Sequence, residues 1–120
     1  MKILVADDSR VMRQIVTRTL RQAGFGDHDV VEAADGRQAF DAVNAEALDL
    51  VISDWNMPEM TGIEVLNALR AGGSRVPFGF VTSECTPQMQ QAAQDAGALF
   101  FIIKPFTADR FTEVFTPILG

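Results

Sequence analysis

The residues of this chain that could do chemistry are acidic, and they follow two short apolar runs. Asp7 and Asp8 come directly after ILVA at 3–6, and Asp54 comes directly after LVIS at 50–53. Continuous apolar runs are typical of strands buried on both faces of a parallel sheet. If the two strands are neighbours, their ends bring the three carboxylates around one crevice.

The negative charges in such a crevice repel one another unless a cation or a proton compensates them. Two carboxylates about 4 Å apart repel each other by about 4 kcal/mol at an effective dielectric constant of about 20. We therefore expect the cluster to bind a divalent cation, to take up a proton, or both.

Composition limits the class of protein. The 120 residues suffice for one compact domain, which we expect to span 1–120, and a hydrophobic share of 48% argues against disorder. The net charge is −6 with no basic stripe, so direct nucleic-acid binding is not expected. Cys85 is the only cysteine, which excludes an internal disulfide and suits a reducing cytoplasm. Neither a signal peptide nor an apolar run of membrane-spanning length is evident, so we expect a soluble, cytoplasmic protein without membrane insertion.

The chain alternates between strand-like and helix-like patterns. The strand-like runs cover residues 3–7, 29–34, 49–54, 77–82 and 99–103. The second run is mixed with acidic residues, which favours a position at the edge of the sheet. Regular βα alternation predicts a parallel sheet with helices on both faces and right-handed crossovers.

Helix boundaries are indicated by cap-forming residues. The first helix carries apolar residues at helical spacing from Val11 to Leu20, and Gly24 ends it. Asp35 and Thr61 each resemble the first residue of a capping box. The last two helix starts are predicted at Thr86, which precedes a proline, and at Thr107.

The ends of the predicted strands define the candidate site, because open sheets of this type bind ligands outside the carboxyl ends of their strands. Oxygen ligands without histidine or cysteine favour Mg²⁺. Asp54 could be a metal ligand, a nucleophile, or both, since a carboxylate that attacks a phosphoryl group forms an acyl phosphate. Thr82 and Lys104, at two other strand ends, are the natural hydroxyl and cationic donors for such a transfer.

In combination these residues resemble a known family. The motifs are the pair Asp7-Asp8, the stretch SDWNMP at 53–58, the strand-end Thr82 and the dipeptide Lys104-Pro105. They resemble the receiver domain of bacterial two-component response regulators, most closely the stand-alone CheY-like type, over essentially the whole chain. The resemblance implies a flavodoxin-like, doubly wound (βα)5 three-layer sandwich, with a five-stranded parallel sheet in the order 2-1-3-4-5.

The resemblance also implies roles for the acidic residues. Asp54 is expected to be the phosphoacceptor. Asp7 and Asp8 are expected to bind Mg²⁺, together with Asp54 and the backbone carbonyl of Asn56.

Further roles fall on residues around the acids. The resemblance implies that Thr82 is the switch hydroxyl that follows the phosphoryl group and that Lys104 is its cationic partner. The resemblance also implies that Asn56 and Glu84 stand at the positions that tune hydrolysis of the phosphoryl group. The aromatic switch position, usually tyrosine in the chemotaxis proteins, is Phe101, and the chain contains no tyrosine.

The function implied is a phosphorylation-driven switch. Phosphate would come from the phosphohistidine of a sensor histidine kinase or phosphotransfer protein, or from a small donor. A monomer would then bind an unidentified downstream protein through its fourth helix, fifth strand and fifth helix, catalysing only its own phosphorylation and dephosphorylation. A phosphate sink in a phosphorelay, or a receiver-like structural or interaction module that is never phosphorylated, stays open. An aspartate-nucleophile phosphatase would normally carry an acid two residues after the nucleophile, where this chain has Asn56.

Overall fold

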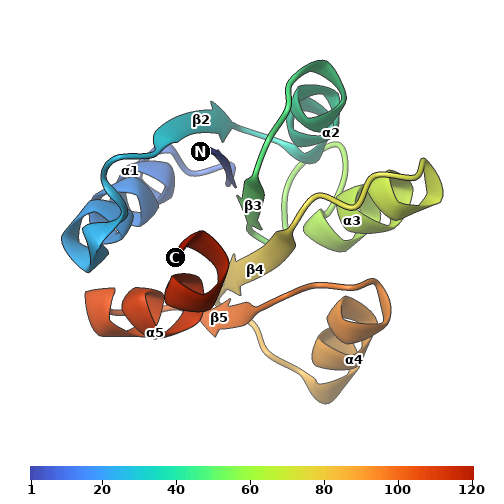
Figure 1. The fold of residues 1–120 in the computed structure, drawn as a ribbon. Helices are drawn as coiled ribbons and strands as arrows, with labels where there is room; N and C mark the ends of the chain where they lie inside the picture. Colours follow the sequence, from blue (N-terminus) through green and yellow to red (C-terminus); the bar gives the residue numbers. More distant parts are fainter.

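Five parallel strands form one sheet in the order β2-β1-β3-β4-β5 (Figure 1). The computed structural model describes all residues from Met1 to Gly120. The strands are β1 (Lys2–Ala6), β2 (Asp29–Ala33), β3 (Leu50–Ser53), β4 (Phe78–Thr82) and β5 (Phe101–Ile103). The strand order implied by the family resemblance is confirmed, and so is the edge position predicted for the second strand.

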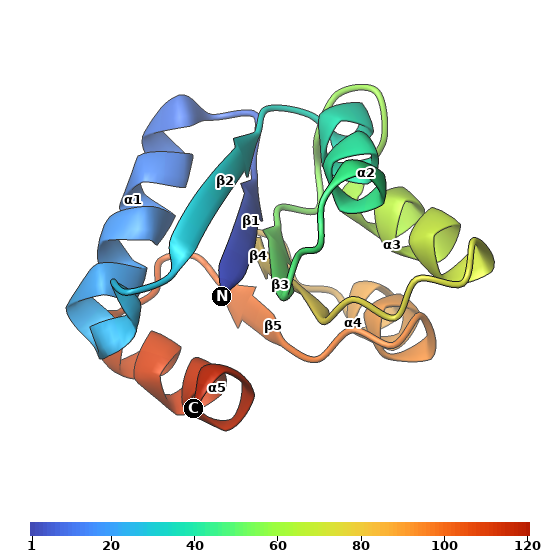
Figure 2. The same cartoon turned by 45° about the horizontal axis from the view of Figure 1, so that its top comes forward.

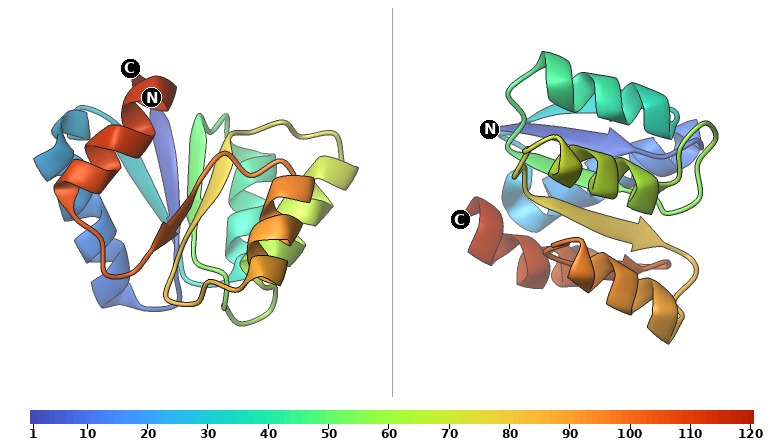
Figure 3. Two further views of the ribbon diagram at one scale, coloured as in Figure 1. Left: turned by 90° about the horizontal axis from the view of Figure 1, so that it is seen from below. Right: turned by 90° about the vertical axis from the view of Figure 1, so that its right-hand side faces the viewer.

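Helices cover both faces of this sheet. They are α1 (Arg10–Leu20), α2 (Gly36–Ala45), α3 (Gly62–Ala71), α4 (Pro87–Asp95) and α5 (Ala108–Leu119), and a π-helical turn, η1 (Arg21–Phe25), extends α1. Helices α1 and α5 lie on one face, and α2, α3 and α4 lie on the other (Figures 2 and 3). This is the predicted three-layer arrangement. None of the helices has the length and apolar character needed to cross a membrane.

The strands alternate their side chains between two cores, as the period of a strand requires. In β1, Ile3 and Val5 join the core beneath α1 and α5, which is completed by Phe111 and Phe115. Leu4 joins the opposite core beneath α2, α3 and α4. Both faces of β1, β3 and β4 are therefore buried, which explains their continuous apolar sequences.

Most helix starts agree with the predicted caps. The Thr61 capping box is complete, and Thr86 and Thr107 cap their helices as predicted. Asp35 does accept a hydrogen bond from the Gln38 amide at 2.7 Å. The prediction of a capping box at Asp35 is wrong, however, because the Gln38 side chain accepts a hydrogen bond from the Ala34 amide and not from the Asp35 amide.

The predicted apolar face of the first helix is wrong at its first residue. Val11 is 63% exposed, whereas Val16 and Leu20 are buried. The predicted end of this helix is confirmed, since Gly24 has a φ of +97°, which interrupts the helical backbone.

The sheet register brings the chemically active residues to one edge. Ala6 pairs with Ser53, so Asp7 and Asp54 emerge side by side from neighbouring strands. The amide of Asp54 donates to the carbonyl of Ala6 at 2.8 Å, which continues the ladder to that point. Thr82 pairs with Ile103, and Lys104 follows at the same edge.

Candidate functional site

Asp7 is the most buried acid of the site, with 4% of its surface exposed. One carboxylate oxygen, Oδ1, accepts the Ser9 amide at 2.9 Å, and Oδ2 lies 3.1 Å from Nζ of Lys104. Burial raises the pKa of the Asp7 carboxyl above its ordinary value, against the opposing effects of the Ser9 amide and Lys104. The ionised form of Asp7 is therefore disfavoured at this buried position.

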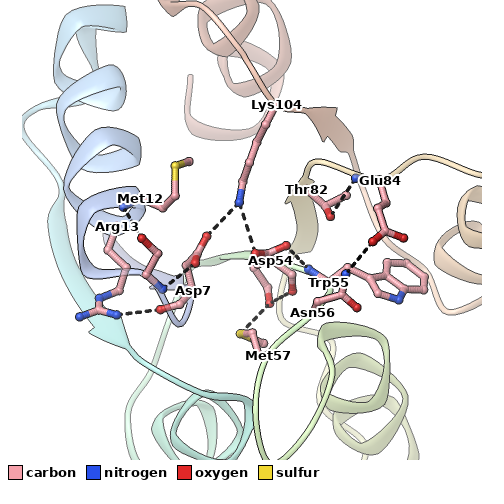
Figure 4. A network of polar contacts seen from close by, with 12 residues as sticks. Asp7, Met12, Arg13, Asp54, Trp55, Asn56, Met57, Thr82, Glu84 and Lys104 are labelled. Atoms are coloured by element: carbon pink, nitrogen blue, oxygen red, sulfur yellow. Dashed lines mark hydrogen bonds and ion pairs between the residues drawn. The ribbon is translucent and has the colours of Figure 1, made fainter.

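Asp54 shares the same ammonium group. Its Oδ2 lies 3.2 Å from Nζ of Lys104, and its Oδ1 accepts the Trp55 amide at 2.7 Å. Lys104 thus bridges two carboxylates that come from different strands (Figure 4). The predicted proximity of Lys104 to the acids is confirmed.

Asp8 completes a group of three acids. Asp7, Asp8 and Asp54 each offer a carboxylate oxygen, and these oxygens lie within 4.8 Å of one another. Asp8 is exposed, and together with Asn56 it lines an open hollow of about 310 Å³. Three carboxylates balanced by one ammonium, with oxygen donors only and access from solvent, fit Mg²⁺.

Thr82, Glu84 and Asn56 form a second polar group beside the carboxylates. The Thr82 hydroxyl, which is buried, accepts the Glu84 amide at 3.5 Å. The Glu84 carboxylate accepts the Asn56 side-chain amide at 3.4 Å. No hydrogen bond joins Thr82, Asn56 or Glu84 to the Asp54 carboxylate. This second polar group therefore lies next to the acids but is not hydrogen-bonded to Asp54.

Phe101 connects the site to the outer edge of the sheet. Its ring centroid lies 6.1 Å from that of Trp55 and 6.0 Å from that of Phe80. Trp55 and Phe80 are themselves in contact, at 4.9 Å. The residue after Asp54 is therefore packed against the half-buried aromatic side chain of β5.

The loop after Asp54 ends at Gly62, where the chain packs so closely against the Asp54 carbonyl and Phe80 that no side chain fits. A Cβ atom on Gly62 would lie 2.2 Å from the Asp54 carbonyl oxygen and 2.9 Å from the ring of Phe80. The Gly62 amide donates to the Trp55 carbonyl at 2.7 Å. This contact folds the loop back onto the strand end that carries the acid.

Two contributors to the site were missed by the sequence analysis. Ser9 caps α1 and donates its amide to Asp7, and a serine directly before a helical run is a recognisable start signal. Arg13 donates from Nη1 to the Asp7 carbonyl at 2.7 Å and from Nε to Glu32 at 2.8 Å. No sequence motif indicates a contact between a side chain and a backbone carbonyl in another element.

Comparison with known proteins agrees with this geometry. The family model described as "Response regulator receiver domain" matches residues 3–116, so the chain belongs to the response regulator receiver domain family. The resemblance seen in the sequence motifs is thereby confirmed.

Chemotaxis regulators are among the proteins to which this chain is similar. The chain is 39% identical to the chemotaxis protein CheY of Pseudomonas aeruginosa, covering 94% of this chain and 91% of that protein. It is 37% identical to the chemotaxis protein CheY1 of Helicobacter pylori, covering 100% and 98%. Among solved structures, chemotaxis protein CheY4 of Vibrio cholerae superposes with a TM-score of 0.84 at 35% identity, covering 98% of this chain and 97% of that one.

Membership of this family fixes the general role of the chain. Receiver domains act in two-component signalling as regulators rather than as classical enzymes. In general they bind Mg²⁺ and interact with kinases and downstream targets. The cluster of Asp7, Asp8 and Asp54 is a suitable site for that ion.

Proposed function

We propose that this chain is a response regulator in which Asp54 accepts a phosphoryl group from the phosphohistidine of a sensor histidine kinase or phosphotransfer protein, or from a small phosphodonor. The observation that carries the proposal is the position of Lys104, whose Nζ lies 3.2 Å from Asp54 and 3.1 Å from Asp7. A carboxylate beside a fixed cation and two further acids has the surroundings that phosphoryl transfer requires.

The transfer itself is a displacement at phosphorus. An oxygen of Asp54 forms a bond to phosphorus while the bond from phosphorus to the donor imidazole nitrogen breaks, and the imidazole keeps the electron pair. Bound Mg²⁺, held by Asp7, Asp8, Asp54 and the carbonyl of Asn56, would neutralise charge on the phosphoryl oxygens. Lys104 supplies a second positive charge.

Loss of the phosphoryl group reverses the modification. Water attacks phosphorus, the bond to the Asp54 oxygen breaks, and inorganic phosphate leaves the restored carboxylate. Asn56 and Glu84, which are hydrogen-bonded to each other at 3.4 Å, are proposed to orient this water. Both residues are exposed, which suits a path for solvent.

The output is proposed to be a change in the face formed by α4, β5 and α5. Thr82 would turn its hydroxyl toward the phosphoryl group and Phe101 would change its packing, which biases an existing equilibrium between two conformations. A hollow of about 400 Å³ between α4 and β5, lined in part by Phe101, supports a protein target at this face. Leu99, which also lines this hollow, is 56% exposed.

The remaining parts of the proposal concern the chain as a whole. Residues 1–120 are proposed to act as a single monomeric receiver domain that binds a protein target and not nucleic acid. A cytoplasmic location is proposed as well, supported by the free thiol of Cys85.

Trp55 provides the experiment. It is the only tryptophan, and its amide donates to the Asp54 carboxylate. Mg²⁺ would be titrated into the metal-free protein, followed by acetyl phosphate or beryllofluoride, with Trp55 fluorescence recorded for wild type, Asp54→Asn and the exposed control Asp27→Asn. We expect saturable quenching by Mg²⁺ and then a donor response that is absent only from Asp54→Asn. A folded wild-type protein that responds to neither addition would refute the proposal and favour an unphosphorylated module.

A further inference from the structure

Arg13 joins three segments of the chain at the acidic site. Its side chain leaves the second turn of α1 and is only 13% exposed. Nη1 donates to the backbone carbonyl of Asp7 at 2.7 Å, as Figure 4 shows. Nε donates to Glu32 of β2 at 2.8 Å. One guanidinium therefore connects α1, the end of β1 and the end of β2.

The contact with Asp7 fixes a particular peptide unit. The Asp7 amide donates to the Ala33 carbonyl at 3.1 Å, and the Asp7 carbonyl accepts from Arg13. That carbonyl belongs to the planar peptide group that leads into Asp8, so its direction also sets the amide and Cα of Asp8.

Asp8 is positioned through the two peptide groups that flank it, one held by Arg13 and the other by the Ser9 amide on Asp7. It is exposed, and its carboxylate accepts no hydrogen bond from the protein. Asp7, by contrast, is held at both carboxylate oxygens by Ser9 and Lys104. The direction in which Asp8 presents its carboxylate therefore depends on its backbone, and Arg13 holds the peptide group that precedes it.

The charge of Arg13 is cancelled nearby. A lone guanidinium beside three carboxylates would compete with a divalent cation, but Arg13 is paired with Glu32, which is half exposed. Glu32 sits opposite Val5 in the sheet register, one pair before the strand end. The pair can thus act through geometry without adding net charge.

We propose that Arg13 is a positioning residue for the divalent-cation site, acting on Asp8 through the Asp7 carbonyl, and that Glu32 holds Arg13 in place and neutralises it. The inference rests on the proposed function, because it concerns the same acidic site. Residues that orient the ligands of a metal typically change its affinity by about 10- to 100-fold when they are lost.

The sign of the effect separates positioning from simple electrostatics. Arg13→Met removes the donors and the charge and keeps an unbranched stem. If Arg13 acted only through its charge, its removal would tighten Mg²⁺ binding. Positioning requires the opposite, and we expect Kd for Mg²⁺, from Trp55 quenching without phosphodonor, to rise by about 10-fold or more.

Two further variants complete the test. Arg13→Met combined with Glu32→Gln leaves the net charge unchanged and should bind Mg²⁺ as weakly as the single variant. Arg13→Lys keeps a donor that can reach one acceptor and should recover part of the affinity. It also secures the test if Arg13→Met does not fold, which urea unfolding in EDTA would reveal.

The matched control is the second arginine–glutamate pair, Arg110 and Glu113 on α5, which are 3.0 Å apart and touch none of the acids. Arg110→Met with Glu113→Gln should leave Kd unchanged. Folded Arg13 variants that bind Mg²⁺ as tightly as wild type, or more tightly, would overturn the inference alone. A wild-type protein that binds no Mg²⁺ would overturn the proposed function and the inference with it.

Discussion

The ammonium group of Lys104 lies 3.2 Å from Oδ2 of Asp54, although the two residues are 50 positions apart in the chain. The same nitrogen reaches Asp7 at 3.1 Å, so one cation compensates two carboxylates. Lys104 is 17% exposed and Asp7 is 6% exposed in their side chains, so this bridge is a partly buried ion pair. In the metal-free protein, Lys104 is the counterion of the site.

Removing Lys104 should therefore destabilise the metal-free protein. Losing one partner of a buried ion pair typically costs about 3–5 kcal/mol, because the other charge is left uncompensated. Because this pair is only partly buried, we expect Lys104→Met to lower the free energy of unfolding in EDTA by about 2–3 kcal/mol, below most of that range. Saturating Mg²⁺ should restore part of the loss, because it binds the folded state. Urea denaturation under both conditions measures this.

The control for Lys104 is Lys2, the other lysine of the chain. Lys2 pairs with Glu46 at 3.1 Å, and both side chains are more than one third exposed, at 39% and 37%. Lys2→Met should cost less than about 1 kcal/mol, with no dependence on Mg²⁺. An equal loss for Lys104→Met in EDTA and in Mg²⁺ would show that Lys104 is not the counterion.

The buried carboxyl of Asp7 predicts a dependence of stability on pH. Its pKa in the folded protein is raised from the ordinary value of 3.8, chiefly because burial disfavours the charged form. The folded state thus binds this proton more tightly than the unfolded state. The resulting stabilisation is complete below 3.8 and is lost as the pH rises through the raised pKa.

Asp7→Asn, which cannot ionise, should therefore unfold at higher urea concentration than wild type at neutral pH in EDTA. This advantage should shrink as the pH falls toward 3.8, where the wild-type carboxyl is protonated as well. Saturating Mg²⁺ should remove the advantage at neutral pH, because only the wild type retains the Asp7 carboxylate, which binds the ion more strongly than a neutral amide oxygen. An advantage that is constant from neutral pH into acid would contradict the assignment.

The polar pair of Asn56 and Glu84 should control how long phosphorylation lasts. Asn56→Leu removes the amide that bonds Glu84, and an apolar side chain cannot orient water. Loss of one hydrogen bond of about 1 kcal/mol corresponds to about fivefold in rate, so dephosphorylation should slow by about that factor. Phosphate release after removal of the donor measures it. The exposed Asn67→Leu on α3 serves as control, and an unaltered decay in Asn56→Leu would count against the proposed role.

The close packing of Gly62 against Asp54 and Phe80 predicts that a larger residue at this position lowers the stability of the fold. This prediction does not depend on the proposed function of the site. Gly62→Ala would place Cβ against the Asp54 carbonyl and Phe80, so the loop must move, at a cost of about 1–3 kcal/mol or more. Gly72→Ala is the control, since the nearest atom to its added Cβ lies at 3.5 Å. Urea denaturation compares the two. Equal stability of both variants would mean that the loop is not held as the structure shows.

The positions of the acids could be predicted because they depend on strands, and short apolar runs that alternate regularly with helix-like segments are typical of strands with both faces buried. Asp7, Asp54 and Lys104 converge because every parallel strand presents its carboxyl end at the same edge. The contact of Arg13 could not be predicted, since it depends on one side-chain conformation and a backbone acceptor. The burial of Val11 was predicted wrongly. Helical spacing shows which residues lie on the same face of a helix, but it does not show how far along the helix that face stays covered by the core.

The pairing of Lys104 with Asp7 spans 97 positions, almost the length of the chain. The acids that follow β1 and β3 are synthesised before their counterion, which comes directly after β5. During biosynthesis the carboxylates therefore exist without Lys104 until β5 has joined the sheet. The charge balance of the acidic site is for that reason among the last features of the fold to form.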